Sequence, residues 1–188
     1  MPLALSDVDL RAPLLELLDR YRAATPEDEP TVRLFQEFAG AHADCLERSC
    51  VPGHLTGSAW LVDNTGQRVL LTHHRKLHKW LQLGGHADGD GDLARVALRE
   101  AEEESGLGDL IAEPAIFDLD RHMIPARGKE SAHWHYDVRF VARATGSEEF
   151  VVTLESHALA WREITEIAVD SSVDESVRRM ARKWLKRG

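Results

Sequence analysis

The chain has 188 residues, enough for one domain with its own hydrophobic core and a small extension. Hydrophobic residues make up 43% and charged residues 29%, a balance that excludes a disordered chain. The formal net charge of −9 disfavours duplex nucleic acid as a partner, and no apolar run approaches the length that spans a bilayer, so no membrane partner is expected.

The N-terminus and the cysteines indicate a cytoplasmic protein. The first residues carry Asp7 and Asp9 and no long apolar run, unlike a signal peptide. Cys45 and Cys50 lie close together without forming a C-x-x-C motif. We expect them to be free thiols in a reducing compartment, and nothing in the sequence supports a bridge between them.

Residues 1–50 are predicted to form a helical N-terminal extension. Two apolar helical faces flank the breaker at 26–30. The residues of these faces are Leu14, Leu15, Leu18 and Tyr21, then Val32, Phe35, Phe38, Ala39 and His42. Such faces pack against something, and the sequence leaves open whether the extension covers a site or forms a homodimer interface.

Residues 51–188 are predicted to form the main domain, beginning with strands and a helix. A strand near 55–62 and a strand at 68–72 should form a hairpin around the turn 63–66. We expect a glycine-rich loop at 80–92 and then a helix at 93–105, which Gly106 ends.

The rest of the chain reads as strands followed by a helix. The expected strands are 115–118, 122–124 and 133–142, then shorter ones at 151–154 and 158–161. An amphipathic helix is expected at 174–186, with Val177, Met180, Ala181 and Trp184 on one face. Strands mixed with helices place the fold in the α/β (α+β) class, as a sandwich of layers with a mixed sheet.

Three carboxylates on the helix at 93–105 carry the chemistry. Glu100, Glu103 and Glu104 are spaced i, i+3 and i+4, so they share one helical face. Carboxylates at that spacing repel each other, and a bound cation such as Mg²⁺ or Mn²⁺ removes the conflict. Arg99 can pair with one carboxylate and fix its direction. The alternative is a solvated acidic face without a ligand.

The segment from Gly85 to Leu107 resembles the Nudix box. That box reads Gly, five residues, Glu, seven residues, Arg-Glu, an apolar residue, any residue, Glu-Glu, any residue, Gly and an apolar residue. Gly85 opens it here, and residues 99–107 complete it in register. The resemblance implies a Nudix-like α/β/α sandwich with a mixed sheet, from about His54 onward, with the N-terminal helical extension outside it.

One position departs from the box. Its first Glu falls on Gly91, between Asp90 and Asp92. Either aspartate can substitute for it or cap the following helix. Because that Glu is mainly structural in the family, the departure puts the loop geometry in question more than the metal site.

The resemblance implies roles residue by residue. Glu100, Glu103, Glu104 and the carbonyl of Gly85 would bind the metal, and Arg99 would orient the glutamates. The reaction would be attack of water on one phosphorus of a small-molecule diphosphate substrate. The general base would be Glu100 or Glu103, or a residue on a distant loop.

Histidines suggest a second metal site. His133 and His135 share one strand face with Asp137. The family's isomerase branch has a histidine and acid metal site, and alignment with it places ligands at His54, His86, His133 and His135. This alignment motivates the hypothesis of a transition-metal site there, for Zn²⁺ or Mn²⁺. The alternative is separate histidines that form hydrogen bonds or contact substrate.

Two further groups of residues bear on substrate binding. Basic side chains before the box either attract phosphates or are simply exposed; they are His73, His74, Arg75, Lys76, His78 and Lys79. Aromatic side chains either stack on a ring of the substrate or belong to the core; they are Trp60, Trp80, Trp134 and Tyr136.

The favoured function is metal-dependent hydrolysis of a diphosphate linkage in a nucleoside diphosphate linked to another moiety, or in a similar small substrate. The isomerase is disfavoured because its catalytic Cys falls on Gly84. A non-catalytic ligand sensor is the second alternative. Such domains usually lose box glutamates, whereas this chain keeps them.

Overall fold

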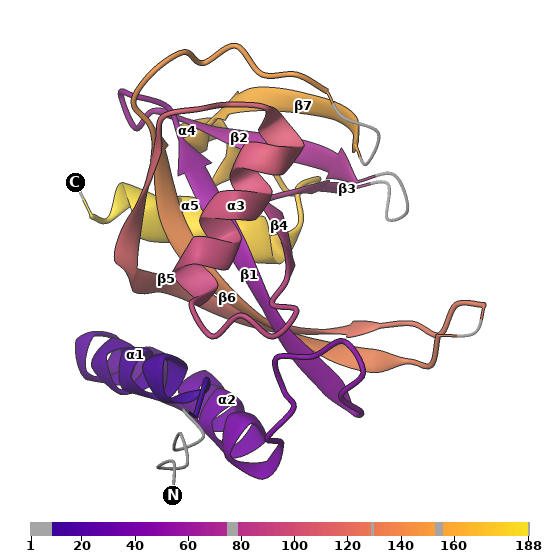
Figure 1. Ribbon diagram of the computed structural model, residues 1–188. Helices are drawn as coiled ribbons and strands as arrows, with labels where there is room; N and C mark the ends of the chain where they lie inside the picture. The colour runs from indigo at the N-terminus through magenta and orange to yellow at the C-terminus, as the bar shows by residue number, and fades with distance from the viewer. Residues whose placement is uncertain (1–8, 75–78, 129, 153–155, 188) are drawn as a thin grey trace, which may run out of the picture.

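The computed structural model describes residues 9–74, 79–128, 130–152 and 156–187. The extension forms two helices that lie together below the rest of the molecule, joined by a short 3-10 turn (Figure 1). Their bounds are α1 Ala12–Ala24, η1 Pro26–Asp28 and α2 Glu29–Ala41. The predicted helical faces are largely confirmed, with Leu14, Leu18 and Tyr21 buried in α1 and Val32, Phe35, Phe38 and Ala39 buried in α2. Leu15 is only half-buried, and His42 lies past the end of α2.

The strands of the described chain form one mixed sheet of seven. Strand β1 is central: it pairs in parallel with β6 and antiparallel with β2 and β4. Strand β5 lies beyond β6, while β3 and β7 both pair with β2. The bounds are β1 Gly53–Val62, β2 Arg68–His74, β3 Lys79–Leu81, β4 Leu83–His86, β5 Leu110–Ile124, β6 His133–Ala144 and β7 Ser156–Glu163.

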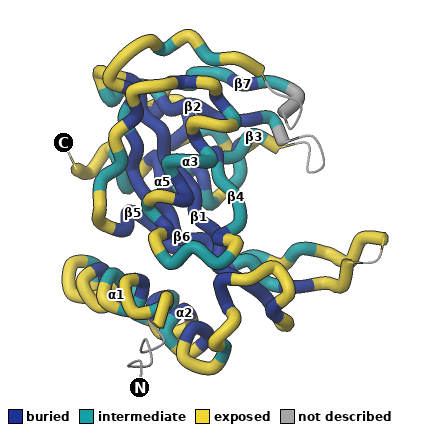
Figure 2. Tube along the Cα trace, in the orientation of Figure 1, coloured by how far each residue is buried: buried dark blue, intermediate teal, exposed yellow. Residues whose placement is uncertain are grey.

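Helices cover both faces of the sheet, which confirms the α/β/α sandwich (Figure 1). Helix α3, Leu93–Ser105, lies on one face, and α4 and α5, Ile164–Ile167 and Glu175–Leu185, lie on the other. Successive residues of β1 alternate between the two cores: Leu61 packs on the α3 side and Trp60 on the α5 side. Burial is continuous along β1, as Figure 2 shows.

The prediction of a glycine-rich loop at 80–92 is wrong in its first half. Strand β3 forms there by pairing with β2, and β4 forms because Gly84 and Gly85 pair with Ser58 and Gly57 of β1. Alternation of apolar and polar residues cannot reveal β4, because two of its four residues are glycines. The predicted helix at 93–105 and its end at Gly106 are confirmed.

The remaining elements agree with the sequence in type more than in length. The strands expected at 115–118 and 122–124 are one strand, β5, whose register shifts between Ala112 and Asp118. The hairpin of β1 and β2 and the C-terminal helix are confirmed. The strand expected at 151–154 falls partly outside the described residues, and 151–152 are not a strand.

The extension packs directly on the main domain. Tyr136 of β6 stacks on Phe38 with ring centroids 3.9 Å apart and meets Phe35 edge-on at 5.3 Å. Buried residues of α1, α2 and α3 belong to one continuous hydrophobic core. In the part of the chain that the structure describes, none of the helices has both the length and the apolar character to cross a membrane.

Candidate active site

Helix α3 is fixed at both ends, and this positions its glutamates. Asp92 caps the N-terminus, where its side chain accepts a hydrogen bond from the backbone N–H of Arg95 at 3.1 Å. Gly106 ends the helix with φ of 69°, a left-handed conformation that favours glycine. One face is buried against the sheet, through Leu93, Val96, Ala97 and Ala101. The box glutamates lie off this stripe.

The glycines of β4 are required by close contacts on opposite faces of the strand. A Cβ on Gly84 would lie 2.3 Å from Oγ of Ser58. A Cβ on Gly85 would lie 2.3 Å from the carboxylate carbon of Glu100. The Glu100 carboxylate therefore lies directly over the backbone of Gly85, as a metal shared by the two would require.

Two of the three box carboxylates contact this strand. Glu100 accepts a hydrogen bond from Arg99 at 3.0 Å, and the same Arg99 nitrogen reaches the carbonyl of His86 at 3.4 Å. Glu104 accepts a hydrogen bond from the backbone N–H of Gly84 at 2.9 Å. Glu103 is exposed. Within the described residues, the three do not form a group whose ligand atoms all lie within 4.8 Å of one another.

The donor set of this site fits a hard divalent cation. Glu100 and Glu104 bring carboxylate oxygens to the Gly84–Gly85 backbone, and Glu103 stands one turn along from Glu100. Oxygen ligands of this kind suit Mg²⁺ or Mn²⁺ rather than softer metals. The Arg99 pair holds one side of Glu100, which agrees with the orienting role expected for Arg99.

The departure at Gly91 has a structural reason. A Cβ on Gly91 would lie 2.1 Å from the carbonyl oxygen of Leu10, at the start of the extension. The neighbouring aspartates are occupied, Asp90 by Arg95 at 2.7 Å and Asp92 by the helix cap. The extension therefore fills the space that a side chain at position 91 would need.

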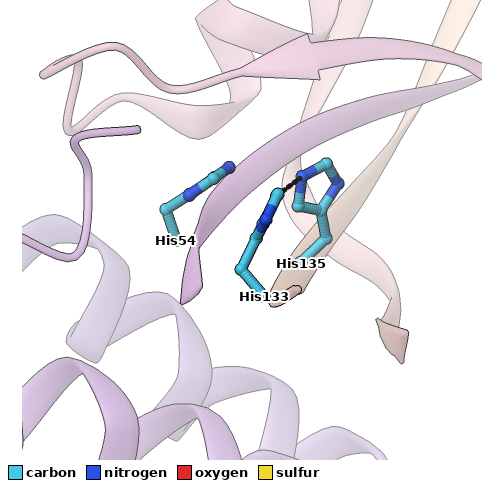
Figure 3. Close-up of side chains that lie close together, drawn as sticks. All are labelled: His54, His133 and His135. Atoms are coloured by element: carbon cyan, nitrogen blue, oxygen red, sulfur yellow. Dashed lines mark hydrogen bonds between the residues drawn. The ribbon is translucent and has the colours of Figure 1, made fainter. Parts of the chain in front are cut away.

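The four histidines expected at a second site lie together. Ring nitrogens of His54, His133 and His135 all lie within 4.8 Å of one another, and Figure 3 shows the three rings converging. The ring of His86 lies 5.0 Å from that of His54 and 5.1 Å from that of His135. These residues come from β1, β4 and β6, on the face opposite α3.

Hydrogen bonding leaves the nitrogens of this cluster available as ligands. Both ring nitrogens of His54 are buried and have no hydrogen-bond partner among the described residues. The Nδ1–H of His133 donates to the carbonyl of Ser131 at 2.8 Å, so its Nε2 carries the lone pair, 3.3 Å from Nε2 of His135. An orienting bond at one nitrogen is typical of metal-binding histidines.

The cluster favours neutral imidazoles, the form that binds metals. Burial, together with the nearby His86 and His133, lowers the pKa of His54 to about 4. Burial also lowers the pKa of His135 to about 2, with the same help from its neighbours. Buried unpaired nitrogens that are neutral and convergent fit a transition metal such as Zn²⁺.

Sequence reasoning missed a fifth histidine. His122 of β5 pairs in register with His135, with ring centroids 5.4 Å apart, and its Nδ1 contacts Asp120 at 3.1 Å. A signal would have been its two-residue spacing from Asp120, which places both side chains on one face of β5. Asp137 shares the histidine face as predicted, but it accepts hydrogen bonds from Thr56, Ser58, Gln82 and Arg139 instead.

The structure gives a place to some of the basic and aromatic residues that the sequence singled out for substrate binding. Residues 75–78 of the basic group lie outside the described residues, and Lys79 pairs with Asp174 at 2.9 Å. Trp60 and Tyr136 belong to the cores. Trp134 is half-buried and carries the guanidinium of Arg121 at 4.2 Å from its ring.

Comparison with known proteins places these features in a family. The model of the NUDIX domain matches residues 53–184. No curated protein sequence matches the chain. The fold is similar to that of a C. elegans Ap4A hydrolase, at a TM-score of 0.55 and 18% identity, covering 71% of this chain and 96% of that one.

Two further solved structures share the fold. The E. coli dihydroneopterin triphosphate pyrophosphohydrolase has a TM-score of 0.57 and 16% identity, covering 71% of this chain and 96% of its own. The NUDIX domain of Shewanella oneidensis NrtR, solved with ADP ribose, has a TM-score of 0.50 and 18% identity, covering 73% and 92%.

Proposed function

This chain belongs to the NUDIX domain family, and from that membership we propose that it is a metal-dependent pyrophosphohydrolase. Water attacks one phosphorus of a diphosphate linkage, the bridging P–O bond breaks, and two phosphate-bearing products and a proton are released. The observation that carries this proposal is the Glu100 carboxylate, which lies over Gly85 and is oriented by Arg99.

Glu100, Glu103, Glu104 and the carbonyl of Gly85 would hold Mg²⁺ or Mn²⁺. When bound, the metal neutralises phosphate oxygens and lowers the pKa of the attacking water. Of the two glutamates that suit the role of general base, we assign it to Glu103. Glu100 pairs with Arg99 at 3.0 Å and its side chain is only 19% exposed, whereas Glu103 is exposed.

The proposed substrate is a nucleoside diphosphate linked to another moiety, or a similar small diphosphate. The named neighbours act on or bind compounds of this kind: Ap4A, dihydroneopterin triphosphate and ADP ribose. The net charge of −9 keeps duplex nucleic acid an unfavourable partner. Cys45 and Cys50 are free and buried, which supports a cytoplasmic location.

The test is turnover of a panel of diphosphate compounds with Mg²⁺ or Mn²⁺, measured by the phosphate products released. Glu103→Gln should lose about 100-fold or more in kcat, since a general base contributes at least that much. Glu102→Gln is the matched control, because Glu102 is exposed on the same helix and occupies a box position that accepts any residue. Equal activity in the two variants would exclude Glu103 as the base.

A ligand sensor is the second candidate, favoured by the likeness to the NrtR domain that was solved with ADP ribose. Absence of turnover on every compound, together with tight binding of one of them, would favour it. The isomerase stays disfavoured, because Gly84 stands where that branch needs a cysteine and has no room for a side chain beside Ser58.

We also propose that His54, His86, His133 and His135 bind a transition metal, Zn²⁺ or Mn²⁺. The support is the convergence of their rings and the unpartnered nitrogens of His54 in the described structure. Tetrahedral Zn–N bonds place ligand nitrogens roughly 3.4 Å apart, so the rings need only a small inward movement. Such an ion would link β1, β4 and β6.

Metal content of protein purified without an affinity tag tests this site. The wild type should hold about one transition-metal ion per chain, and the Co²⁺-loaded protein should show visible absorption bands. His135→Ala should lose both, whereas His73→Ala, which alters a histidine beside Trp80, should keep both. A wild type without bound transition metal, and unable to take up Co²⁺, would overturn the proposal.

A further inference from the structure

The segment between α2 and β1, residues 42–52, packs on the loop between β4 and α3, residues 87–92, which we call the box loop. The backbone N–H of Gly89 donates to the carbonyl of Leu46 at 3.1 Å, and that of Leu55 donates to the carbonyl of Cys45 at 2.8 Å. The carbonyl of Leu10 fills the space beside Gly91. These contacts come from residues that precede the matched NUDIX domain, so the loop is held from outside the domain.

Arg48 reaches from this segment into the box loop. Its Nε and Nη2 donate to the two carboxylate oxygens of Asp88, at 2.6 and 2.7 Å. The Arg48 side chain remains 60% exposed, and the pair uses only two of its three nitrogens. The guanidinium is thus aimed by Asp88 while it keeps donors open to a ligand.

Arg48 is tied to the box loop at Asp88, which is close in sequence to residues of both sets of proposed metal ligands. Asp88, which aims it, follows Gly85 by three residues and His86 by two. The charge of Arg48 lowers the pKa of His86, after the larger effect of burial. The charge of Glu100 in turn raises the pKa of Arg48, after the larger effect of the Asp88 hydrogen bond.

A fixed positive group at this place has a chemical use. The substrate of the proposed reaction is a polyanion, while the chain has a net charge of −9 and the site itself displays glutamates. Arginine recognises phosphate oxygens through paired N–H donors. The neighbouring Arg99 is directed at Glu100 and the carbonyl of His86.

We propose that Arg48 binds a phosphate group of the substrate, so that the N-terminal extension completes the active site. This inference rests on the proposed function, because it assigns a subsite of the same reaction. Asp88 acts as a positioning residue, which holds the guanidinium without contacting the substrate.

Two variants separate phosphate binding from a structural ion pair. Arg48→Gln and Asp88→Asn both break the pair, but only the first removes the positive charge. Arg48→Gln should raise KM, and the Kd for Mg²⁺-imidodiphosphate, by about tenfold or more, with a smaller change in kcat. Asp88→Asn should change both by less than about threefold, and Arg48→Lys should recover part of the loss.

The controls fix the outcomes. Arg33→Gln breaks an exposed ion pair with Glu29 elsewhere in the extension and should change nothing. The inference that Arg48 binds phosphate would be overturned if Arg48→Gln and Asp88→Asn had equal effects, or if Arg48→Gln left the Kd unchanged. Turnover by the wild type would still support the proposed hydrolase in that case. If Arg48→Gln binds imidodiphosphate more weakly but the wild type turns over none of the compounds, the phosphate subsite is supported and the proposed hydrolase activity is overturned. A wild type that neither binds imidodiphosphate nor turns over overturns both.

Discussion

At the scale of single residues, Gly85 links the strand to the catalytic helix. Gly85→Ala places a methyl group 2.3 Å from the carboxylate carbon of Glu100. Because that carboxylate is the end of a flexible side chain, it will swing away at little cost in stability. Its displacement should lower kcat by about 100-fold, as misplacement of a catalytic group by about 1 Å can do.

Steady-state kinetics and thermal unfolding, run in parallel, check this prediction. Gly108→Ala is the control, since a Cβ at Gly108 meets nothing within 4 Å. Full activity in Gly85→Ala would show that Glu100 does not need its present place.

The sequence predicted site residues where a short pattern holds them and missed those that only the fold brings in. Glu100 and Glu104 stand one helical turn apart, so their common face follows from spacing. Arg48 reaches Asp88 across 40 positions, and His122 reaches His135 through strand pairing. A residue pattern carries no information on contacts of this range.

At the scale of elements, the extension and the box loop depend on each other through Gly91. Gly91→Ala places a Cβ 2.1 Å from the Leu10 carbonyl, a backbone atom that cannot rotate away. We expect a loss of about 1–3 kcal/mol in the free energy of unfolding, the usual cost of overpacking. The Gly91→Glu variant restores the residue that the family has at this position, yet it should be no more stable than Gly91→Ala.

Urea unfolding measures whether Gly91→Ala lowers the free energy of unfolding, with Gly40→Ala as the comparison. Gly40 lies in α2 and its Cβ would meet nothing within 4 Å, so alanine should raise stability by about 0.5–1 kcal/mol through helix propensity. A Gly91→Ala protein as stable as the wild type would show that Leu10 yields freely.

The helices and the strands β1, β2 and β6 were predicted closely, whereas β4 and β5 were not. The caps and apolar stripe of α3 gave its bounds at 93–105. Strand β4 is held by pairing with β1, and β5 continues past Pro114 through two shifts of register with β6. Those features depend on partners that are distant in sequence.

At the scale of the whole molecule, partly buried ion pairs join the extension to the last helix. Lys183 of α5 donates to Asp28 of the extension at 2.9 Å and to Asp118 of β5 at 3.1 Å. Burial raises the pKa of Asp28, but hydrogen bonds from Tyr21 and Lys183 outweigh it, so this pKa lies below its usual value.

This network predicts how stability depends on acid. Because the pKa of Asp28 is lower in the folded chain than in the unfolded chain, its contribution is present above about pH 4 and is lost as the pH falls further. Asp28→Asn should therefore destabilise at pH 7, by about 1 kcal/mol, and much less at pH 3. Urea unfolding at both values measures it. Asp19→Asn, at an exposed carboxylate of α1, should show no such difference.

The layered fold could be predicted from the sequence, but the place of the extension could not. Apolar faces on α1 and α2 indicated that the helices pack on something. Contacts in the structure, such as the stacking of Tyr136 on Phe38, show that the main domain is one such surface. Both rings are apolar positions in their own elements, and nothing in either element identifies the other.

Two consecutive residues of β4 face two different proposed metal sites. The Glu100 carboxylate lies over Gly85, whereas the ring of His86 lies in the histidine cluster on the other face of the sheet. A shift of one residue in a strand exchanges its two faces. An insertion or deletion of a single residue in β4 would therefore turn both ligand sets to the wrong faces at once. The length of this strand should thus be inherited as strictly as its two glycines.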